Sequence, residues 1–450
     1  MNPIQDQLSD ESPVRVIHGA DEIRRVLLNR STGLVEIDEE AAGISSQVFH
    51  ESLTPEAFVD RVIRTVEAEG DMGVRNIAHA LDDSTPGSFE IPSAHLAHAR
   101  SRATSNLGTD FQLAADRIRA FHEQELPTAF DDTSNETGQR WIPVDRAGIY
   151  VPGQAAPLVS TVLMAAIPAQ VAGVAEVVVT TPVGHDGISP AMALALHVAG
   201  VKRVFTIGGA QAIAALAIGT ESVPRCDVIA GPGNPWGVLA KRALYGIVGI
   251  DLLPGPTETL IIADATADAA DVAADLIAQA EHGGPASPIA LTSERSLATS
   301  ITHEVQSQLA DLPRGQLARD SFRLRGGVGI VDSLNEAINL ANAYAPEHLC
   351  LLVQDAEALL PRIRHAGGVF LGRTSPEVLG DYVAGPSHVM PTGGTARFSS
   401  PLGVRSFLKS MSVIRFSGTR AAELAPVAAR MARAEGLEGH ARAAERRTNS

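Results

Sequence analysis

Three short runs rich in β-branched residues decide the fold class of this chain: Val177-Val-Val-Thr-Thr181, Arg203-Val-Phe-Thr-Ile207 and Asp227-Val-Ile-Ala230. Stretches rich in Ala and Leu separate them, with one helix expected at Pro190–Ala199 and another from Ala210. Short strands that alternate with helices are typical of parallel βαβ units. We therefore expect a Rossmann-like unit in this part of the chain.

The same alternation returns further along the sequence. After a helix expected at Thr266–Ala280, the pattern predicts strands near Ile289–Leu291, Val328–Val331, Leu349–Val353 and Val369–Leu371. By contrast, residues 1 to about 140 carry charged segments of helical period, such as Pro55–Glu69 and Ser101–Gln124. A strand at Ser412–Phe416 and a basic helix from Ala421 are expected near the C-terminus.

We therefore predict an α/β protein with two Rossmann-like parallel-sheet units in series, a helical N-terminal region and a small C-terminal tail. The predicted boundaries are 1–140 for the helical region, 141–264 and 265–395 for the two units, and 396–450 for the tail.

Composition excludes several classes of protein. The chain has 450 residues and a net charge of −16, which disfavours binding to nucleic acid or to an anionic membrane. Cys226 and Cys350 are its only cysteines, which excludes a disulfide framework and favours a reducing cytoplasm. The acidic N-terminus does not resemble a secretory signal, and we expect no transmembrane segment.

A glycine-rich turn is a candidate phosphate site. The segment Gly231-Pro-Gly-Asn-Pro-Trp-Gly237 follows an expected strand and begins a helix, so its N–H groups are available to a phosphate. Asp251 lies 20 residues after Gly231, as a ribose-binding carboxylate would. The spacing is not GxGxxG, however, and a plain tight turn explains the segment equally well.

Four segments pair an imidazole with an oxygen-bearing side chain: Gln279 with His282, Glu347 with His348, Asp381 with His388, and Glu435 with His440. Positions three apart on a helix lie about 60° apart, so the first pair could bind one ion. The second pair precedes a strand at a sheet edge, where active sites of α/β proteins gather. Taken singly, each pair is also explained by a solvated surface, an ion pair, an Asx-turn or a fraying terminus.

Taken together, nine motifs occur in the order known from one family. They are Arg146-Ala-Gly-Ile-Tyr-Val-Pro-Gly153, 160–173, 208–217, Gly231-Pro-Gly-Asn234, Gly255-Pro-Thr-Glu258, Gln279-Ala-Glu-His-Gly283, Tyr344-Ala-Pro-Glu-His-Leu349, Gly380-Asp-Tyr382 and Glu435-Gly-Leu-Glu-Gly-His440. From about Arg140 to His440, the chain resembles histidinol dehydrogenase. That family oxidises histidinol to histidine through the aldehyde in two NAD-dependent steps, the last of histidine biosynthesis.

The resemblance also implies roles for individual residues. The zinc ligands of the family fall on Gln279, His282, Asp381 and His440, and its catalytic pair falls on Glu347 and His348. The substrate contacts fall on the same ligands and on His348, with Glu435 and Thr257 in addition. The NAD contacts, which belong to the first unit, fall on Tyr150, Gln211 and Asn234. In the family, the imidazole takes the hydroxyl proton and the carboxylate helps to activate water.

The resemblance further implies how the chain assembles. The N-terminal segment would pack back onto the second unit, and the C-terminal tail would cross to the neighbouring subunit of a homodimer with shared active sites. The segments 153–160 and 284–288 depart from the usual family pattern, and Cys350 stands where an acidic residue is frequent. A related zinc and NAD dehydrogenase of another small amino alcohol or diol, such as a sulfonated propanediol, therefore remains the alternative function.

Overall fold

The computed structural model describes residues 13–30, 39–82, 87–153, 158–184 and 186–446. Most of the acidic N-terminal segment and residues 154–157 of the divergent segment 153–160 lie outside the described residues. The chain divides into two compact units, the first made of residues 1–125 and 145–407 and the second of residues 126–144 and 408–450. The first unit contains two parallel sheets, and the second contains one antiparallel sheet.

The first sheet has five parallel strands in the order β6-β5-β4-β7-β8. These strands are β4 (Arg146–Tyr150), β5 (Glu176–Thr180), β6 (Arg203–Phe205), β7 (Val228–Ala230) and β8 (Gly249–Ile250). They are connected by α7 (Val159–Val171), α8 (Pro190–Val198), α9 (Gly209–Ile218) and α10 (Pro235–Leu244). Because the strand order reverses between β4 and β7, a ligand is expected to bind outside the carboxyl ends of these strands.

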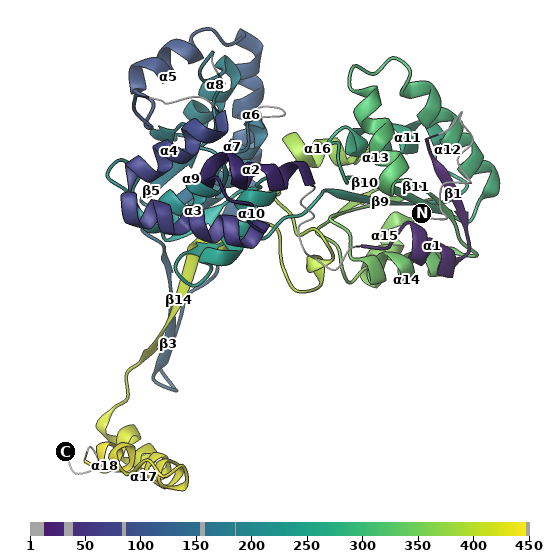
Figure 1. Ribbon diagram of the computed structural model, residues 1–450. Helices are drawn as coiled ribbons and strands as arrows, with labels where there is room; N and C mark the ends of the chain where they lie inside the picture. Colours follow the sequence, from purple (N-terminus) through teal and green to yellow (C-terminus); the bar gives the residue numbers. More distant parts are fainter. Residues whose placement is uncertain (1–12, 31–38, 83–86, 154–157, 185, 447–450) are drawn as a thin grey trace. The chain divides into compact units, whose positions relative to one another are not determined.

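The second sheet has six parallel strands in the order β1-β11-β10-β9-β12-β13. Figure 1 shows β1 next to β11 in this sheet. Its strands are β1 (Arg15–His18), β9 (Glu258–Ala263), β10 (Ser287–Thr292), β11 (Gly327–Ile330), β12 (His348–Leu352) and β13 (Gly368–Leu371). Without β1, the two sheets have the same order, in which the first strand along the chain lies at the centre. The N-terminal segment adds β1 as an edge strand beside β11, as the family resemblance implies.

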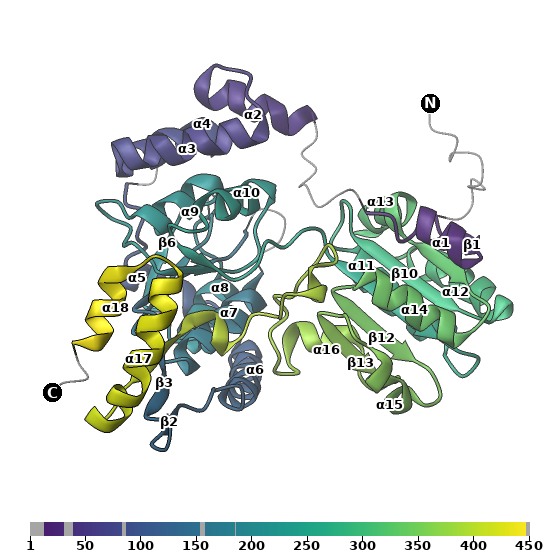
Figure 2. The same ribbon diagram turned by 90° about the horizontal axis from the view of Figure 1, so that it is seen from below.

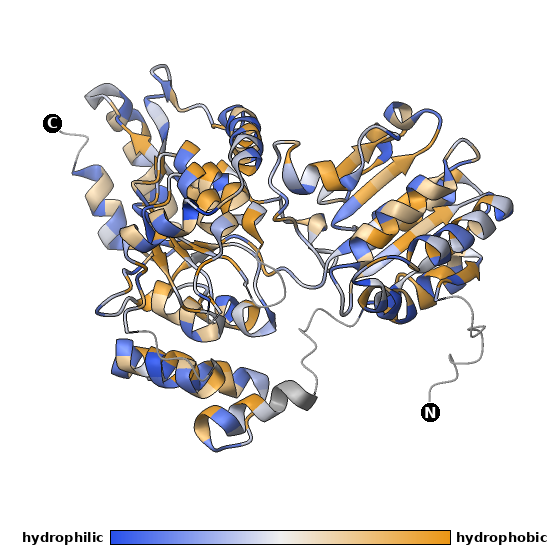
Figure 3. Ribbon diagram, turned by 90° about the horizontal axis from the view of Figure 1, so that it is seen from above, coloured by the Kyte–Doolittle hydropathy of each residue, from blue (hydrophilic) through white to orange (hydrophobic). Residues whose placement is uncertain are grey.

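Helices and short 3-10 turns complete this part of the first unit. They are α1 (Ala20–Val26), α11 (Ala269–Ala280), α12 (Arg295–Gln308), α13 (Gly315–Arg325), α14 (Leu334–Tyr344), α15 (Ala356–Leu359), η2 (Leu360–Arg362), α16 (Glu377–Tyr382), η3 (Thr395–Arg397) and η4 (Val404–Phe407). The strands of the second sheet carry mostly apolar residues between helices whose outer faces are hydrophilic (Figure 3). The burial of β9, β10 and β12 along their whole length explains why these strands do not alternate between apolar and polar residues.

Residues 39–123 of the N-terminal region are mainly helical, as predicted, whereas β1, β2 (Phe130–Asp132) and the start of β3 (Thr137–Pro143) are strands that the prediction for residues 1–140 did not include. The helical part contains α2 (Glu39–Phe49), α3 (Pro55–Glu69), α4 (Asp71–Asp82), α5 (Ser93–Arg100) and α6 (Ser105–Glu123). Helix α3 begins where the Thr54 hydroxyl accepts the N–H of Ala57 and Pro55 occupies the first turn. Its apolar face, with Phe58 and Val62, shares one hydrophobic core with Leu216 of α9, so these helices cover the first sheet.

The second unit is a small antiparallel sheet followed by two helices. Strands β2 (Phe130–Asp132), β3 (Thr137–Pro143) and β14 (Leu408–Ile414) pair in the order β14-β3-β2. Helices α17 (Gly418–Ala434) and α18 (Glu438–Glu445) lie side by side (Figure 2). The chain turns between them at Gly436, whose φ of 77° favours glycine. Arg433 joins the helices through ion pairs to Glu438 and Glu445.

The structure departs from the sequence expectations in several places. The central strands β4 and β9 are not predicted above, and the strand expected at Ser412–Phe416 is instead β14, which begins at Leu408. Asp381, for which an Asx-turn was one explanation, lies in α16. No helix in the described part of the chain is both long and apolar enough to span a membrane.

Candidate active site

Glu347 and His348 lie where α14 passes into β12. Helix α14 ends at Tyr344, and Ala345 adopts a left-handed conformation with a φ of 52°. The chain then enters the sheet, so that His348 is the first residue of β12. The pair therefore lies at the amino end of this strand, whereas ligands of open α/β sheets usually bind at the carboxyl ends.

Glu347 is a buried carboxyl group held by two donors. Its Oε2 accepts hydrogen bonds from the Thr257 hydroxyl at 2.7 Å and from the backbone N–H of Glu258 at 3.0 Å. Burial raises the pKa of Glu347 to about 7, while His348 and these two donors oppose the shift. A carboxyl group that titrates near neutrality can both release and accept a proton under physiological conditions.

His348 is fixed through one ring nitrogen and leaves the other without a protein partner. Its Nδ1 lies 3.1 Å from the carbonyl oxygen of Glu258, and because a carbonyl only accepts, Nδ1 carries the proton. Its Nε2 is buried and has no hydrogen-bond partner within the described part of the chain. In the neutral ring this nitrogen is therefore the proton acceptor. Asp381 Oδ1 lies 4.0 Å from it, and Glu377 Oε1 lies 3.4 Å from Nδ1.

Helix α16 brings Asp381 to the histidine because it packs closely on β13. A Cβ atom at Gly380 would lie 2.6 Å from the ring of Phe370, so only glycine permits this approach. The Phe370 ring in turn lies 5.9 Å from the His348 ring, measured between centroids. His388 also supports this segment, with Nδ1 2.9 Å from the Asp381 carbonyl and Nε2 3.2 Å from the Thr161 hydroxyl of α7.

Gln279 and His282 lie at the end of α11, and only Gln279 is inside the helix. Gln279 is buried in the last turn, and His282 follows in the turn after the C-cap. The Gln279 Oε1 accepts a hydrogen bond from Thr259 at 3.0 Å, whereas its Nε2 is buried with no partner among the described residues. His282 is largely exposed, yet partial loss of hydration lowers its pKa; Asp381 opposes this shift and His348 adds to it. These groups therefore share one electrostatic environment.

The remaining two residues of the implied site lie in the second unit. Glu435 is the exposed C-cap of α17, and His440 is exposed on α18. Gly436 follows the C-cap of α17, and Gly439 lies inside α18. Within the described ranges, no three His, Cys, Asp or Glu side chains are grouped so that they could hold a metal ion.

The implied nucleotide contacts gather at the carboxyl ends of the first sheet. Tyr150 is the last residue of β4, and its hydroxyl accepts the N–H of Gly209 at 3.1 Å, where α9 begins. Gln211 is buried in the first turn of α9. Asn234 caps α10, because its Oδ1 accepts the N–H of Gly237 at 2.9 Å.

The glycine turn after β7 is tightly constrained. Gly231 has a φ of 109°, and a Cβ atom there would lie 2.2 Å from the Tyr150 carbonyl oxygen. Asp251 does not serve as a free ribose-binding carboxylate, because it accepts the N–H of Gly231 at 2.7 Å and pairs with Lys241. The Lys241 ammonium group donates a further hydrogen bond to the Gly231 carbonyl at 2.9 Å. The acidic residue therefore stabilises the turn.

Sequence reasoning missed two buried carboxylates of the site. Glu258 was quoted only as part of the motif Gly255-Pro-Thr-Glu258, although its backbone contacts both Glu347 and His348. Glu377 lies four residues before Asp381, a spacing that places both on one face of α16 and could have indicated it. Both cysteines are buried and unpaired, and burial raises the pKa of Cys350 well above its usual value, as expected for a thiol that is not catalytic.

Comparison with known proteins identifies the family of this chain. Residues 48–448 match the family model of histidinol dehydrogenase. A histidinol dehydrogenase of Deinococcus radiodurans is 49% identical over 96% of this chain and 100% of its own length. That of Thermus thermophilus is 47% identical over 88% of this chain and 95% of its own length. The crystal structure of histidinol dehydrogenase from Elizabethkingia anophelis has a TM-score of 0.87 and 31% identity and covers 98% of this chain and 99% of its own. The chain therefore belongs to the histidinol dehydrogenase family of oxidoreductases.

Proposed function

We propose that this protein oxidises L-histidinol to L-histidine through histidinaldehyde, with two NAD⁺ consumed, as the last steps of histidine biosynthesis. The observation that carries the proposal is the pair Glu347 and His348. One imidazole nitrogen is fixed, the other has no partner among the residues that the structure describes, and the neighbouring carboxyl group has a raised pKa. The pair lies within a family match that extends over most of the chain.

His348 acts as the base in the first oxidation. With the proton on Nδ1 held by the Glu258 carbonyl, Nε2 is oriented to take the hydroxyl proton of the alcohol. A hydride leaves the carbon atom that bears this hydroxyl group, so the alcohol loses two electrons and two hydrogens and becomes the aldehyde. NAD⁺, when bound, accepts the hydride in each of the two oxidations.

Glu347 serves the second half of the reaction. The aldehyde must first add water, because a hydride can leave only from the hydrated carbon. Near neutral pH, a carboxyl group with a pKa of about 7 is partly ionised and can take a proton from that water. Thr257 and the backbone N–H of Glu258 hold the carboxyl group through Oε2.

Three side chains of the first unit offer the nitrogen and oxygen donors that zinc binds. The Nε2 of Gln279 is buried without a partner in the described part of the chain, and a rotation of this amide by 180° would place its oxygen there. The rotated amide could still hydrogen bond to Thr259, whose hydroxyl contacts both Gln279 and Glu377. We propose that Gln279, His282, Asp381 and His440 hold one zinc ion per subunit. Bound there, the ion would orient the nitrogen atoms of the substrate and polarise its oxygen.

We propose that NAD⁺ binds at the carboxyl ends of β4 and β7. We propose Tyr150, Gln211 and Asn234 as its contacts, since all three surround the start of α9 or α10. The glycine at 231 keeps the backbone close to β4, and helix α10 begins within the same turn, which suits a diphosphate group.

The proposed assembly is a homodimer with shared active sites. Glu435 and His440 lie on a separate compact unit, so their assignment as substrate and zinc ligands includes the proposal that they complete the site of the neighbouring subunit. Exchange of an element between subunits is a low-cost route to a dimer. We also propose a cytoplasmic location, which the two unpaired cysteines favour.

A substrate panel tests the proposed function. Purified protein with zinc and NAD⁺ should turn over histidinol with a higher kcat/KM than other small amino alcohols or diols. Elemental analysis should give about one zinc per chain, and chelation should remove both the metal and the activity. Activity on a sulfonated propanediol without activity on histidinol would favour the alternative function. Full turnover by metal-free protein would contradict the zinc site.

A further inference from the structure

Arg30 binds a buried carboxylate directly beside the catalytic pair. Its Nε and one terminal nitrogen lie 2.6 Å from the two carboxylate oxygens of Glu258. The Glu258 side chain is 6% exposed and the Arg30 side chain 20%, so this ion pair is largely removed from water. Two parallel bonds of this length are the geometry of an ionised carboxylate on a guanidinium group. Burial raises the pKa of Glu258, and Arg30 opposes that shift.

The same guanidinium group also holds the end of α14. It donates to the carbonyl oxygens of Tyr344 and Ala345 and lies over the Tyr344 ring at 3.6 Å. The last carbonyl groups of a helix have no partner inside the helix, and a buried helix end needs other donors. Gly394 leaves room for this arrangement, because a Cβ atom there would lie 2.7 Å from Arg30.

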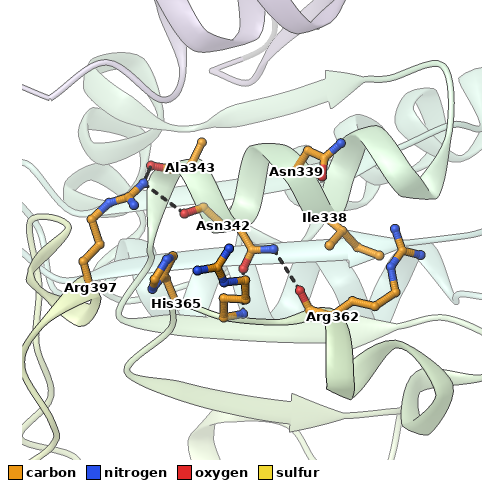
Figure 4. A pocket seen from close by; sticks show the side chains of 8 residues that line it. Ile338, Asn339, Asn342, Ala343, Arg362, His365 and Arg397 are labelled. Atoms are coloured by element: carbon orange, nitrogen blue, oxygen red, sulfur yellow. Dashed lines mark hydrogen bonds between the residues drawn. The ribbon is translucent and has the colours of Figure 1, made fainter.

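A second arginine donates hydrogen bonds to the neighbouring carbonyl groups of α14. Figure 4 shows Arg397 reaching the carbonyl oxygens of Asn342 and Ala343, at 3.1 and 2.6 Å, beside a cavity of about 390 Å³. Two arginines therefore satisfy four consecutive carbonyl groups at the end of α14. Of the two, only Arg30 also binds Glu258. Substituting each arginine in turn therefore distinguishes an effect on the helix end from an effect on the catalytic pair.

We propose that Arg30 is a positioning residue for the catalytic pair. It joins two segments that are distant in sequence: residues 257–259, whose backbone N–H and carbonyl contact Glu347 and His348, and residues 344–345, which lead into that pair. Without the guanidinium group, each segment can shift independently. A displacement of about 1 Å at a reacting group can lower the rate by about 100-fold.

This inference rests on the proposed function, because its kinetic test uses histidinol. The test compares Arg30→Gln with two matched controls. Arg397→Gln removes the other arginine from the end of α14 and leaves Glu258 paired, and Arg24→Gln removes an exposed ion pair to Asp21 in α1. All variants are compared at equal zinc content and at a temperature well below unfolding.

We expect Arg30→Gln to lower kcat by about 10- to 100-fold. The KM values for histidinol and NAD⁺ should stay within about threefold, because Arg30 contacts neither proposed binding site. Loss of folded protein would also lower the apparent kcat without changing KM, so kcat is expressed per folded protein, measured by circular dichroism. Both controls should retain kcat within about threefold. The double variant Arg30→Gln/Glu258→Gln should be no slower than the slower single variant, since the two side chains act as one unit.

Hydrogen exchange without substrate provides an independent readout. Arg30→Gln should accelerate amide exchange in both segments, 256–260 and 345–349, whereas Arg397→Gln should affect at most the end of α14. Unchanged exchange and an unchanged kcat in Arg30→Gln would overturn the positioning role, as would equal losses in Arg397→Gln. If the unmodified protein does not oxidise histidinol, the proposed function fails, while hydrogen exchange still decides whether Arg30 holds the two segments.

Discussion

Replacing Glu347 with glutamine should stabilise the protein at alkaline pH while it impairs catalysis. Burial raises the pKa of this carboxyl group to about 7, compared with an ordinary value of 4.5. Below pH 4.5 the group is protonated in both the folded and the unfolded chain, so it does not affect stability. Between pH 4.5 and 7 only the unfolded chain ionises readily, so folding loses stability as the pH rises.

The size of this loss of stability follows from the difference between the folded and unfolded pKa values. The free energy of unfolding decreases by about 3 kcal/mol, and the decrease is complete above pH 7. Glutamine cannot ionise, yet its oxygen can still accept the hydrogen bonds from Thr257 and Glu258. The free energy of unfolding of Glu347→Gln, relative to the unmodified protein, should therefore be higher by about 3 kcal/mol at pH 8 than at pH 4.5.

Urea unfolding at the two pH values, at equal zinc content, measures this difference. Because the two pH values are compared within each protein pair, effects of the substitution that do not depend on pH cancel. The exposed Glu357→Gln is the matched control and should show no such pH dependence. The same stability change at pH 4.5 and pH 8 would refute the raised pKa and with it the role of Glu347 as a base near neutrality.

Three further outcomes are expected. Lys241→Met leaves the Asp251 carboxylate buried without its cation, which should cost about 3–5 kcal/mol in urea unfolding and raise the KM for NAD⁺; an unchanged stability would contradict the buried pair. Gly231→Ala places a Cβ atom 2.2 Å from a carbonyl oxygen of β4. Steady-state kinetics should therefore show that the KM for NAD⁺ increases more than the KM for histidinol, each compared with the unmodified protein. Mixed dimers of the inactive variants His348→Ala and His440→Ala should regain part of the activity if sites are shared, and no recovery from verified mixed dimers would exclude sharing.

The sequence predicts the architecture where local signals are strong. Helix α3 has a capping Thr54, a proline in its first turn and an apolar face, and its bounds agree with the prediction. Strand β9, by contrast, is buried on both faces as the central strand of its sheet, so it shows no alternation that distinguishes it from a buried helix. Its partners lie far along the chain, and only the folded sheet identifies it as the centre.

The candidate site also contains residues that the sequence indicates and residues that it does not. The proposed ligands and the proposed catalytic pair stand in short motifs, so the family resemblance could name them. Arg30 stands in no motif, and its ion pair spans 228 residues of sequence, so no local pattern indicates it. The sequence does not predict the tautomer of His348 either, because the position of the ring proton depends on a carbonyl group in a different strand.

The number of NADH molecules formed for each histidinol consumed shows whether this protein carries out both oxidations. Two are expected, because His348 and Glu347 are proposed to act in successive oxidations of the same carbon, with water added between them. The measurement requires limiting histidinol, excess NAD⁺ and the zinc-loaded protein, with histidine quantified as the product. One NADH with the aldehyde as the final product, or no NADH at all, would exclude the proposed two-step oxidation.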